Sequence, residues 1–253
     1  MRDGDRVPSD TAPAVDAGPA LDALSEGIRA PLFTLLGWTS LMRIGELERD
    51  RFGAAADAID RSAFAHVELV DRLLDVARIH HRKLELRRER VDLTRPLSDA
   101  CARTKRLLDA KRLQLSMDVP AGAVVMGDPE RLTQIVVHLV TNAVQCTPER
   151  GAIALTLKSD RVRATVEVAD TGRGIAVERL DSIFDCFAHA RAEDAKRGLG
   201  LGLFLARALA ELHGGQLQAS SLGVGRGARF RLTLPRADGI VPVSPRGSIP
   251  RRR

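Results

Sequence analysis

The chain has 253 residues, of which 44% are hydrophobic and 28% are charged, so it is long and apolar enough to bury a core. Its net charge of +6 comes mainly from arginines scattered among acidic residues, and it has no tyrosine. A nucleic-acid-binding surface needs clustered basic residues and stacking aromatic rings. The composition therefore argues against a nucleic-acid-binding protein and also against an intrinsically disordered one.

The sequence also indicates the cellular compartment of the protein and the nature of its two termini. Cys101, Cys146 and Cys186 are too few and too far apart for a disulfide framework. No run of about 18 uncharged apolar residues occurs, and the N-terminus lacks the apolar stretch of a signal peptide. We therefore expect a cytoplasmic protein without a membrane segment. Residues 1–19 are expected to be a disordered leader and residues 237–253 a disordered basic tail.

A helical hairpin is predicted over residues 20–85. Apolar residues recur at steps of three and four from Leu21 to Met42 and again from Ile59 to Ala77, and residues 45–53 form the connection. Pro31 should bend the first helix because it lacks a backbone N–H. Two apolar seams on one hairpin can be buried by a second copy, which gives a four-helix dimer bundle. The alternative is packing against the rest of the same chain.

An α/β sandwich with one helical layer over one mixed sheet is predicted over residues 91–236, so the fold class is α+β. The apolar runs alternate between helical and strand periodicity. We expect helices at 95–111, 129–146 and 201–213, and strands at 113–119, 124–126, 152–158, 164–169, 216–220 and 228–234.

Asn142 is a polar residue on the otherwise largely apolar helix 129–146. Its amide oxygen suits Mg²⁺, which prefers oxygen ligands and bridges substrate phosphates. His138 lies one helical turn earlier on the same face and is a second candidate ligand. The alternative for Asn142 is a hydrogen bond to the backbone at the helix end.

Two glycine-rich segments follow. Asp170 ends a predicted strand and can accept a hydrogen bond from an adenine amino group, while Gly172 and Gly174 let the backbone approach a ring closely. The same residues could instead form an ordinary turn. Further on, glycines at 198, 200 and 202 lead into a helix whose N-terminal N–H groups can face an anion.

Together these segments resemble the ATP-binding domain of sensor histidine kinases. Asn142, DTGRGI, IFDCF, GLGLGL and the LHGG to LTLP segment occur in that family's order and spacing, from about Val91 to Pro235. The resemblance implies an ATP-binding domain of the gyrase, chaperone and histidine-kinase type, a transferase activity, and ATP and Mg²⁺ as ligands. It assigns the Mg²⁺ to Asn142 with His138 as the further candidate, and the ATP to Asn142, Asp170, Gly172, Gly174, Ile175, Phe187, Gly198, Leu199, Gly200, Leu201, Gly202 and Leu203.

Three positions depart from the family pattern. His138 stands where Asn is commonest, Gln145 replaces a frequent basic residue, and Ala228 replaces the usual Ser or Thr after a glycine. Each change weakens one polar contact and none removes the pocket.

The hairpin also resembles that family, as its dimerisation and histidine-phosphotransfer domain, through LSEGIRAPLFTLLGW and LLDVARIHHRKLELRRERVDL. Alignment on Arg29 and Pro31 places Glu26 at the phosphoacceptor position and Gly27 at the position of its acidic neighbour. A carboxylate is a weaker nucleophile than a neutral imidazole and repels phosphate, and glycine cannot take a proton. His66, His80 and His81 are the histidines of the hairpin that could replace the acceptor, and we expect each of them to be structural or on the surface instead.

We therefore expect a histidine-kinase-like two-component protein that binds ATP and Mg²⁺ but does not phosphorylate itself at the usual position. Its expected partners are a second copy or another histidine kinase, and a response regulator. One alternative is a non-catalytic interaction module that sequesters a regulator or a kinase. Another is an active kinase with a noncanonical acceptor.

Overall fold

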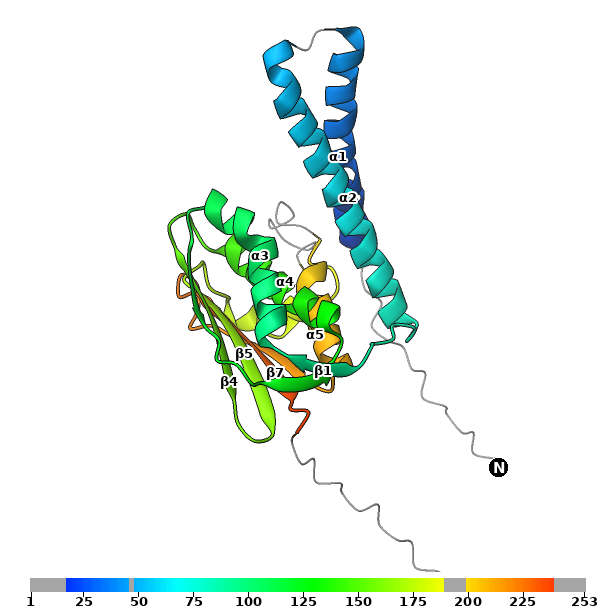
Figure 1. The fold of residues 1–253 in the computed structure, drawn as a ribbon. Helices are drawn as coiled ribbons and strands as arrows, with labels where there is room; N and C mark the ends of the chain where they lie inside the picture. Colours follow the sequence, from blue (N-terminus) through cyan, green and yellow to red (C-terminus); the bar gives the residue numbers. More distant parts are fainter. Residues whose placement is uncertain (1–16, 46–47, 189–198, 239–253) are drawn as a thin grey trace, which may run out of the picture. The chain divides into compact units, whose positions relative to one another are not determined.

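The computed structural model describes residues 17–45, 48–188 and 199–238 (Figure 1). These residues form two compact units, Met1–Leu73 with Phe187–Gly200 and Leu74–Cys186 with Leu201–Arg253. No helix of the described ranges combines the length and apolarity needed to cross a bilayer.

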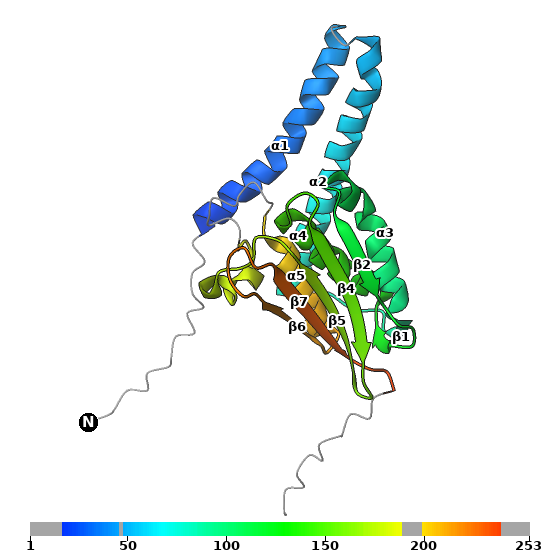
Figure 2. The ribbon, with the colours of Figure 1, turned by 90° about the vertical axis from the view of Figure 1, so that its left-hand side faces the viewer.

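The first unit is dominated by two long helices, α1 (Ala17–Ile44) and α2 (Phe52–His80), with the short 3₁₀ helix η1 (Arg49–Arg51) between them. Pro31 lies inside α1, and Figure 2 shows α1 curved along its length, as expected of a helix that contains proline. On α2, the His66 ring nitrogens lie 3.0 Å from the Ile28 carbonyl oxygen of α1 and 3.2 Å from that of Ser62. His66 thus joins the two helices.

The second unit contains a five-stranded sheet in the order β2-β4-β5-β7-β6. β2 and β4 run parallel and the other pairs are antiparallel, so the predicted mixed sheet is confirmed. Three helices cover one face of the sheet (Figures 1 and 2). The strands are β2 (Gln114–Asp118), β4 (Ala152–Ser159), β5 (Arg163–Asp170), β6 (Gln216–Ser220) and β7 (Ala228–Pro235), and the helices are α3 (Thr94–Ala110), α4 (Pro129–Cys146) and α5 (Leu201–Leu212).

One part of the predicted topology is wrong. β3 (Val124–Gly127) does not join the large sheet but pairs antiparallel with β1 (Glu89–Asp92) in a two-stranded sheet. β1 was not predicted because its four residues include three charged ones and only Val91 is buried, which leaves no apolar alternation to detect. Two 3₁₀ helices after β5, η2 (Val177–Arg179) and η3 (Ser182–Phe184), were also not predicted.

The core lies between the sheet and its helices. Alternate residues of each central strand point into it, as Leu155, Val168 and Leu232 do, while their neighbours Thr156, Glu167 and Arg231 are not buried. Burying such an aliphatic side chain stabilises the fold by about 1.5–3 kcal/mol. One face of the sheet is therefore covered and the other is polar.

The last turns of α2 belong to this second unit and are attached to α4 by a buried carboxylate. Asp75 is 4% exposed, and its Oδ2 accepts hydrogen bonds from Arg131 Nη1 at 2.5 Å and Gln134 Nε2 at 3.0 Å. A buried charge is destabilising unless it is paired, and Arg131 supplies the opposite charge for Asp75. The two hydrogen bonds also fix the position of the Asp75 carboxylate.

Three helices, α2, α3 and α5, end within the second unit in the same backbone motif. At the end of α3, the Leu113 N–H donates to the Leu108 carbonyl at 3.0 Å and the Arg112 N–H to that of Asp109 at 3.0 Å. This pattern requires a left-handed residue, and Arg112 has φ 52° there. Arg82 (φ 53°) and Gly214 (φ 74°) occupy the equivalent places after α2 and α5. Two arginines thus stand where glycine fits without steric strain.

We predict that Arg112→Gly raises the free energy of unfolding by about 0.5–1 kcal/mol, because it removes the left-handed strain without removing a packed side chain. Urea unfolding of the two proteins measures the difference. The matched control is Arg106→Gly at an exposed position inside α3, which should lower stability by about 1 kcal/mol. A loss of stability in both variants would contradict the assignment.

His213, the residue after α5, connects three elements. Its ring is buried, Nδ1 lies 2.7 Å from the Leu209 carbonyl oxygen, and Nε2 accepts the Asp128 N–H at 3.1 Å. A β-carbon at Gly127 would lie 2.6 Å from this ring, so only glycine leaves room for it. Burial lowers the pKa of His213, which is therefore neutral in the folded protein.

We predict that the free energy of unfolding falls as the pH drops below about 6.5, which is the pKa of histidine in an unfolded chain. Below that pH the unfolded chain binds a proton at His213, whereas the folded protein, in which this pKa is lowered, does not. The loss should be up to about 1.4 kcal/mol per pH unit. It should be much smaller in His213→Gln, as measured by urea unfolding at pH 7.5 and 5.5. The exposed His81→Gln serves as the control and should keep the wild-type slope.

Candidate functional site

Helix α4 is capped at both ends. At its N-terminus Asp128 Oδ1 accepts the N–H groups of Glu130 at 3.1 Å and Arg131 at 3.3 Å. At its C-terminus Lys111 Nζ donates to the carbonyl oxygens of Val144 at 2.8 Å and Thr147 at 3.1 Å. An ammonium group there satisfies free carbonyls and opposes the negative end of the helix dipole. The last turns of α4 are therefore held firmly.

Asn142 lies in these last turns and is half-buried, with its Oδ1 4.0 Å from the Cys146 thiol. His138, one turn earlier, is buried. A β-carbon at Gly202 of α5 would lie 3.4 Å from His138 Nδ1, so α4 and α5 approach closely at this point. Gln145 is exposed.

Asp170 ends β5 with its carboxyl group buried. Oδ1 accepts the Gly172 N–H at 2.8 Å and the Ala228 N–H at 3.3 Å. Oδ2 is also buried but has no hydrogen-bond partner in the described part of the chain. Burial raises the pKa of this carboxyl group, while the two backbone hydrogen bonds oppose that shift. The side chain is thus held through one oxygen, while the other is buried without a hydrogen bond from the described residues.

The turn Asp170–Ile175 is packed against the loop Ser221–Gly227. The Gly227 N–H donates to the Gly172 carbonyl at 3.0 Å, and the Gly225 N–H to that of Arg173 at 2.5 Å. A β-carbon at Gly174 would lie 2.0 Å from the Gly223 carbonyl oxygen. At Gly172 and Gly174 the structure shows a close approach to other backbone, and the expected approach of a ligand ring stays a prediction.

The remaining candidate residues divide between the two units. Ile175 is half-buried beside Asp170, and Leu201 and Leu203 are buried in α5, where they contribute to packing. The first unit contains Phe187, with a left-handed φ of 62°, together with Leu199 and Gly200. It also contains Glu26, exposed on α1, and Gly27. Gly198 lies outside the described residues.

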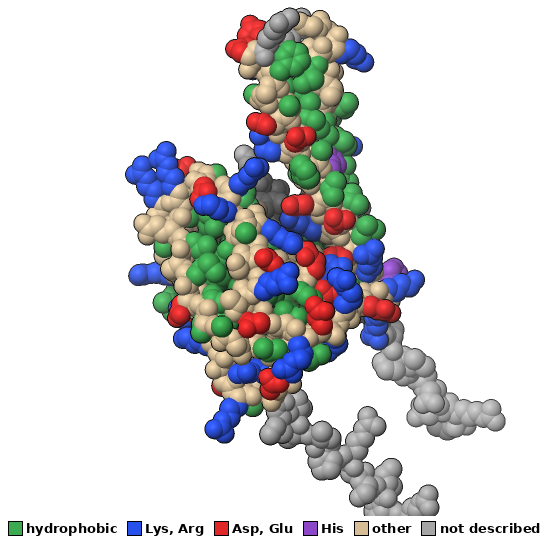
Figure 3. Space-filling view, viewed as in Figure 1, with side chains coloured by type: hydrophobic (Ala, Val, Ile, Leu, Met, Phe, Trp, Pro, Cys, Tyr) green, Lys and Arg blue, Asp and Glu red, His purple; other side chains and the backbone are tan. Residues whose placement is uncertain are grey.

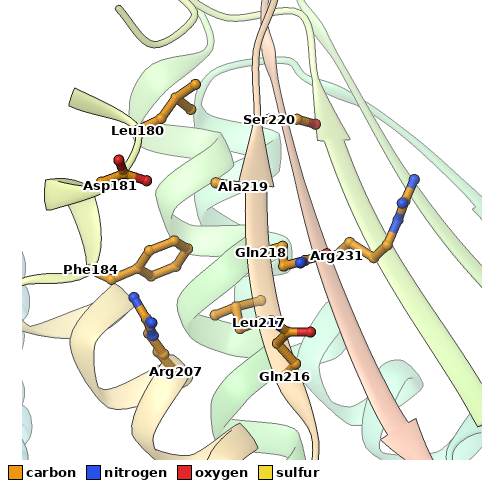
Figure 4. Close-up of a pocket in the computed structure, with 10 residues that line it drawn as sticks. All are labelled: Leu180, Asp181, Phe184, Arg207, Gln216, Leu217, Gln218, Ala219, Ser220 and Arg231. Atoms are coloured by element: carbon orange, nitrogen blue, oxygen red, sulfur yellow. The ribbon is translucent and has the colours of Figure 1, made fainter. Parts of the chain in front are cut away.

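A groove of about 700 Å³ lies beside the edge strand β6 (Figure 4). Its two arginines, Arg207 and Arg231, form ion pairs with Glu211 and Glu167, each at 3.1 Å. It includes neither Asn142 nor Asp170. We therefore place the candidate nucleotide site at Asp170, where a buried acceptor is left open, and not in this groove. The lining residues of the groove are Leu180, Asp181, Phe184, Arg207, Gln216, Leu217, Gln218, Ala219, Ser220 and Arg231.

The geometry agrees with a comparison against known families. Residues 127–238 match the family described as histidine kinase-, DNA gyrase B- and HSP90-like ATPase. This segment is a histidine-kinase-type ATPase domain. It contains α4, β5 and α5, which are the elements that carry Asn142, Asp170 and Gly202.

Proteins similar to the chain as a whole are sensor histidine kinases. Histidine protein kinase DivJ of Caulobacter vibrioides is 35% identical over 231 residues, which are 88% of this chain and 38% of that protein. The circadian input-output histidine kinase CikA of Synechococcus elongatus is 33% identical over 241 residues, 92% of this chain and 32% of that protein. The chain thus spans about a third of the length of these relatives, and its homology to them extends beyond the ATPase domain.

Solved structures show the same fold. Full-length ShkA in complex with AMPPNP has a TM-score of 0.64 at 27% identity and covers 87% of this chain and 46% of that chain. The Acinetobacter baumannii histidine kinase AdeS has a TM-score of 0.63 at 20% identity and covers 84% of this chain and 98% of that chain.

Several residues that shape the ATPase domain were not identified from the sequence. Lys111 caps α4 from another helix end, and Ser221 joins the loop to the Asp170 turn, with Ile175 N–H donating to its Oγ at 3.0 Å. Ala228 was expected to weaken a polar contact because it lacks the usual hydroxyl; the structure shows that its backbone N–H donates to Asp170. The only available signal was the glycine-rich SLGVGRG segment, which indicated a tight loop.

We predict that Gly227→Ala lowers the free energy of unfolding by about 3 kcal/mol or more, because its β-carbon would lie 2.0 Å from the Asp170 carbonyl oxygen. The matched control is Gly225→Ala. Gly225 is also left-handed, at φ 77°, but has nothing within 4 Å of the added carbon. It should cost about 1 kcal/mol. Equal losses in urea unfolding would show that the close approach is not what requires glycine.

Proposed function

We propose that this protein is a histidine-kinase-like component of a two-component system that binds ATP with Mg²⁺, dimerises through the α1–α2 hairpin and does not phosphorylate itself at the usual position. Asp170 is the observation on which the nucleotide part of the proposal depends. A buried carboxylate oxygen without a donor costs stability unless a ligand supplies one. The adenine amino group is a donor of the right kind.

Asn142 supports the metal part of the proposal through the chemistry of its donor atom. Mg²⁺ takes few protein ligands when substrate phosphates and water fill its other positions, and it prefers oxygen. Within the described residues no group of three or more His, Cys, Asp and Glu side chains could hold a metal ion. We expect the amide oxygen of Asn142 to be a protein ligand of the metal, and a metal bound there would neutralise phosphate charge.

Glu26 and Gly27 support the absence of self-phosphorylation. Phosphoryl transfer needs a nucleophile and a group that accepts or orients its proton. Glu26 is exposed on α1, as a surface carboxylate would be, and Gly27 has no side chain. A carboxylate is also repelled by the phosphates that it would have to approach.

The exposed apolar residues of the hairpin support dimerisation. Phe33 is 67% exposed and Phe64 is 70% exposed, and Figure 3 shows hydrophobic side chains along the hairpin. Contiguous apolar surface of this kind is characteristic of an interface. The exposed set is Ile28, Leu32, Phe33, Leu36, Ile44, Phe52, Phe64, Val67, Val70 and Leu74.

The dimer can be tested by sedimentation. We expect the wild-type chain to sediment as a dimer and Phe33→Glu and Phe64→Glu as monomers, because each places a charge in the apolar surface. Val162→Glu, which changes an exposed apolar residue of the other unit, should remain dimeric. A monomeric wild type would contradict this part of the proposal.

We predict that the wild-type chain takes no label from γ-labelled ATP, although it binds ATP and Mg²⁺ in calorimetry. The double variant Glu26→His with Gly27→Glu restores a nucleophile and an acidic neighbour and should gain an acid-labile label. Adding Asp170→Asn to that variant should abolish the label, since the candidate nucleotide site is then altered. Label is measured by gel autoradiography before and after acid treatment.

The other outcomes identify the alternatives. Label on an intact histidine kinase mixed with this chain, and not on this chain, would make it the ATP-presenting half of a heterodimer. ATP binding without label in any mixture or variant would favour a non-catalytic module that sequesters a response regulator or a kinase. Acid-labile label on the wild-type chain would overturn the proposal in favour of an active kinase with another acceptor.

A further inference from the structure

The hydroxyl group of Ser221 lies where the loop Ser221–Gly227 meets the Asp170 turn. Its oxygen accepts the Ile175 N–H at 3.0 Å and the Gly223 N–H at 3.2 Å. Its proton can be donated to the Gly227 carbonyl at 2.7 Å or to that of Gly223 at 3.2 Å. A hydroxyl has one donor and two acceptor positions, so Ser221 uses its full capacity here, and the shorter distance favours Gly227.

The Gly227 carbonyl belongs to the peptide group that holds Asp170. That peptide accepts the Ser221 hydroxyl through its oxygen, and its N–H, on Ala228, donates to Asp170 Oδ1 at 3.3 Å. A hydrogen bond to the oxygen of a peptide fixes its plane and strengthens its N–H as a donor. The orientation of the Asp170 carboxylate therefore depends on Ser221 through one peptide group.

We infer that Ser221 is a positioning residue for nucleotide recognition: it orients the Gly227–Ala228 peptide so that Asp170 Oδ1 is held and Oδ2 stays directed at the base. This inference rests on the proposed ATP binding. Asp170 would touch the base, whereas Ser221 acts through the peptide and through the Ile175 N–H. Its role is to make an acceptor rigid, and a rigid acceptor favours an amino group over a carbonyl at that place on the ring.

Base selectivity separates positioning from plain loop stability. Loss of a structural hydroxyl lowers the stability of the loop and the affinity for every nucleotide alike. Loss of a positioning hydroxyl lets the Asp170 carboxylate rotate, which weakens ATP more than GTP because adenine presents an amino group and guanine a carbonyl oxygen at that ring position. The ratio of the two affinities is therefore the informative quantity.

The experiment measures the affinities of ATP and GTP, with Mg²⁺, by calorimetry on the full chain. For Ser221→Ala we expect ATP to bind at least tenfold more weakly and the ATP-to-GTP affinity ratio to fall at least threefold. Ser221→Thr keeps the hydroxyl and should restore most of the ratio. Ser220→Ala, an exposed neighbour, should match the wild type. The thermal midpoint of each variant without nucleotide is measured in parallel.

Each result decides the inference. An unchanged ratio in Ser221→Ala, with or without a lower thermal midpoint, overturns the positioning role. If Ser221→Ala does not fold, Ser221→Cys, a weaker donor of similar size, should give an intermediate ratio, and a wild-type ratio there overturns the role equally. Failure of the wild-type chain to bind ATP would instead refute the proposed function and would be seen before any variant is compared.

Discussion

The approach of two backbone segments without side chains between them is the constraint on which the ATPase domain depends. The turn Asp170–Ile175 and the loop Ser221–Gly227 lie so close that β-carbons at Gly174 and Gly227 would overlap carbonyl oxygens at 2.0 Å. Two hydrogen bonds between the segments, from Gly225 and Gly227, hold them together. Because backbone geometry here tolerates little movement, the Asp170 carboxylate is held by two backbone N–H groups, those of Gly172 and Ala228, and the Ala228 N–H belongs to the peptide that the Ser221 hydroxyl contacts.

Two buried carboxylates in the second unit, Asp75 and Asp170, differ in how the protein compensates their charge. Asp75 receives Arg131 and Gln134 on one oxygen and lies 3.8 Å from Arg78 through the other, so its charge is compensated inside the protein. Among the described residues no cation forms an ion pair with Asp170, and only one of its oxygens is hydrogen-bonded. An isolated buried acceptor is destabilising by about 1–3 kcal/mol. This cost is what a ligand that donates a hydrogen bond to Asp170 would offset under the proposed function.

Helix α4 carries both a residue that pairs with Asp75 and the candidate metal ligand Asn142. Asp128 and Lys111 fix its ends, Arg131 in its first turn holds Asp75, and Asn142 lies in its last turns. A helix fixed at both ends transmits the position of one end to the other because its own hydrogen bonds are stiff. The candidate metal ligand is thus held by contacts that are made as far as three turns away.

Most of the α+β architecture could be predicted from periodicity, because long elements with a buried face repeat their apolar residues often enough to be recognised. The helix at 129–146 and the strand at 216–220 coincide with α4 and β6. β1 was not predicted because a strand of four residues with one buried side chain shows no alternation of apolar and polar residues. The motif residues of the site could be named from their spacing, but Ser221 and Lys111 could not, since each acts on backbone atoms of a distant segment. Such contacts leave no pattern in the residues that receive them.

The arginines at the left-handed ends of α2 and α3 mean that this sequence does not use all the stability its fold allows. Proteins evolve to a threshold of stability and not to an optimum. A change from arginine to glycine at residue 82 or 112 needs a single nucleotide substitution, whichever arginine codon is used. Positions of this kind can supply additional stability later in evolution. A lineage that altered the loop Ser221–Gly227 and lost stability there could recover it at a helix end, without changing the Asp170 turn.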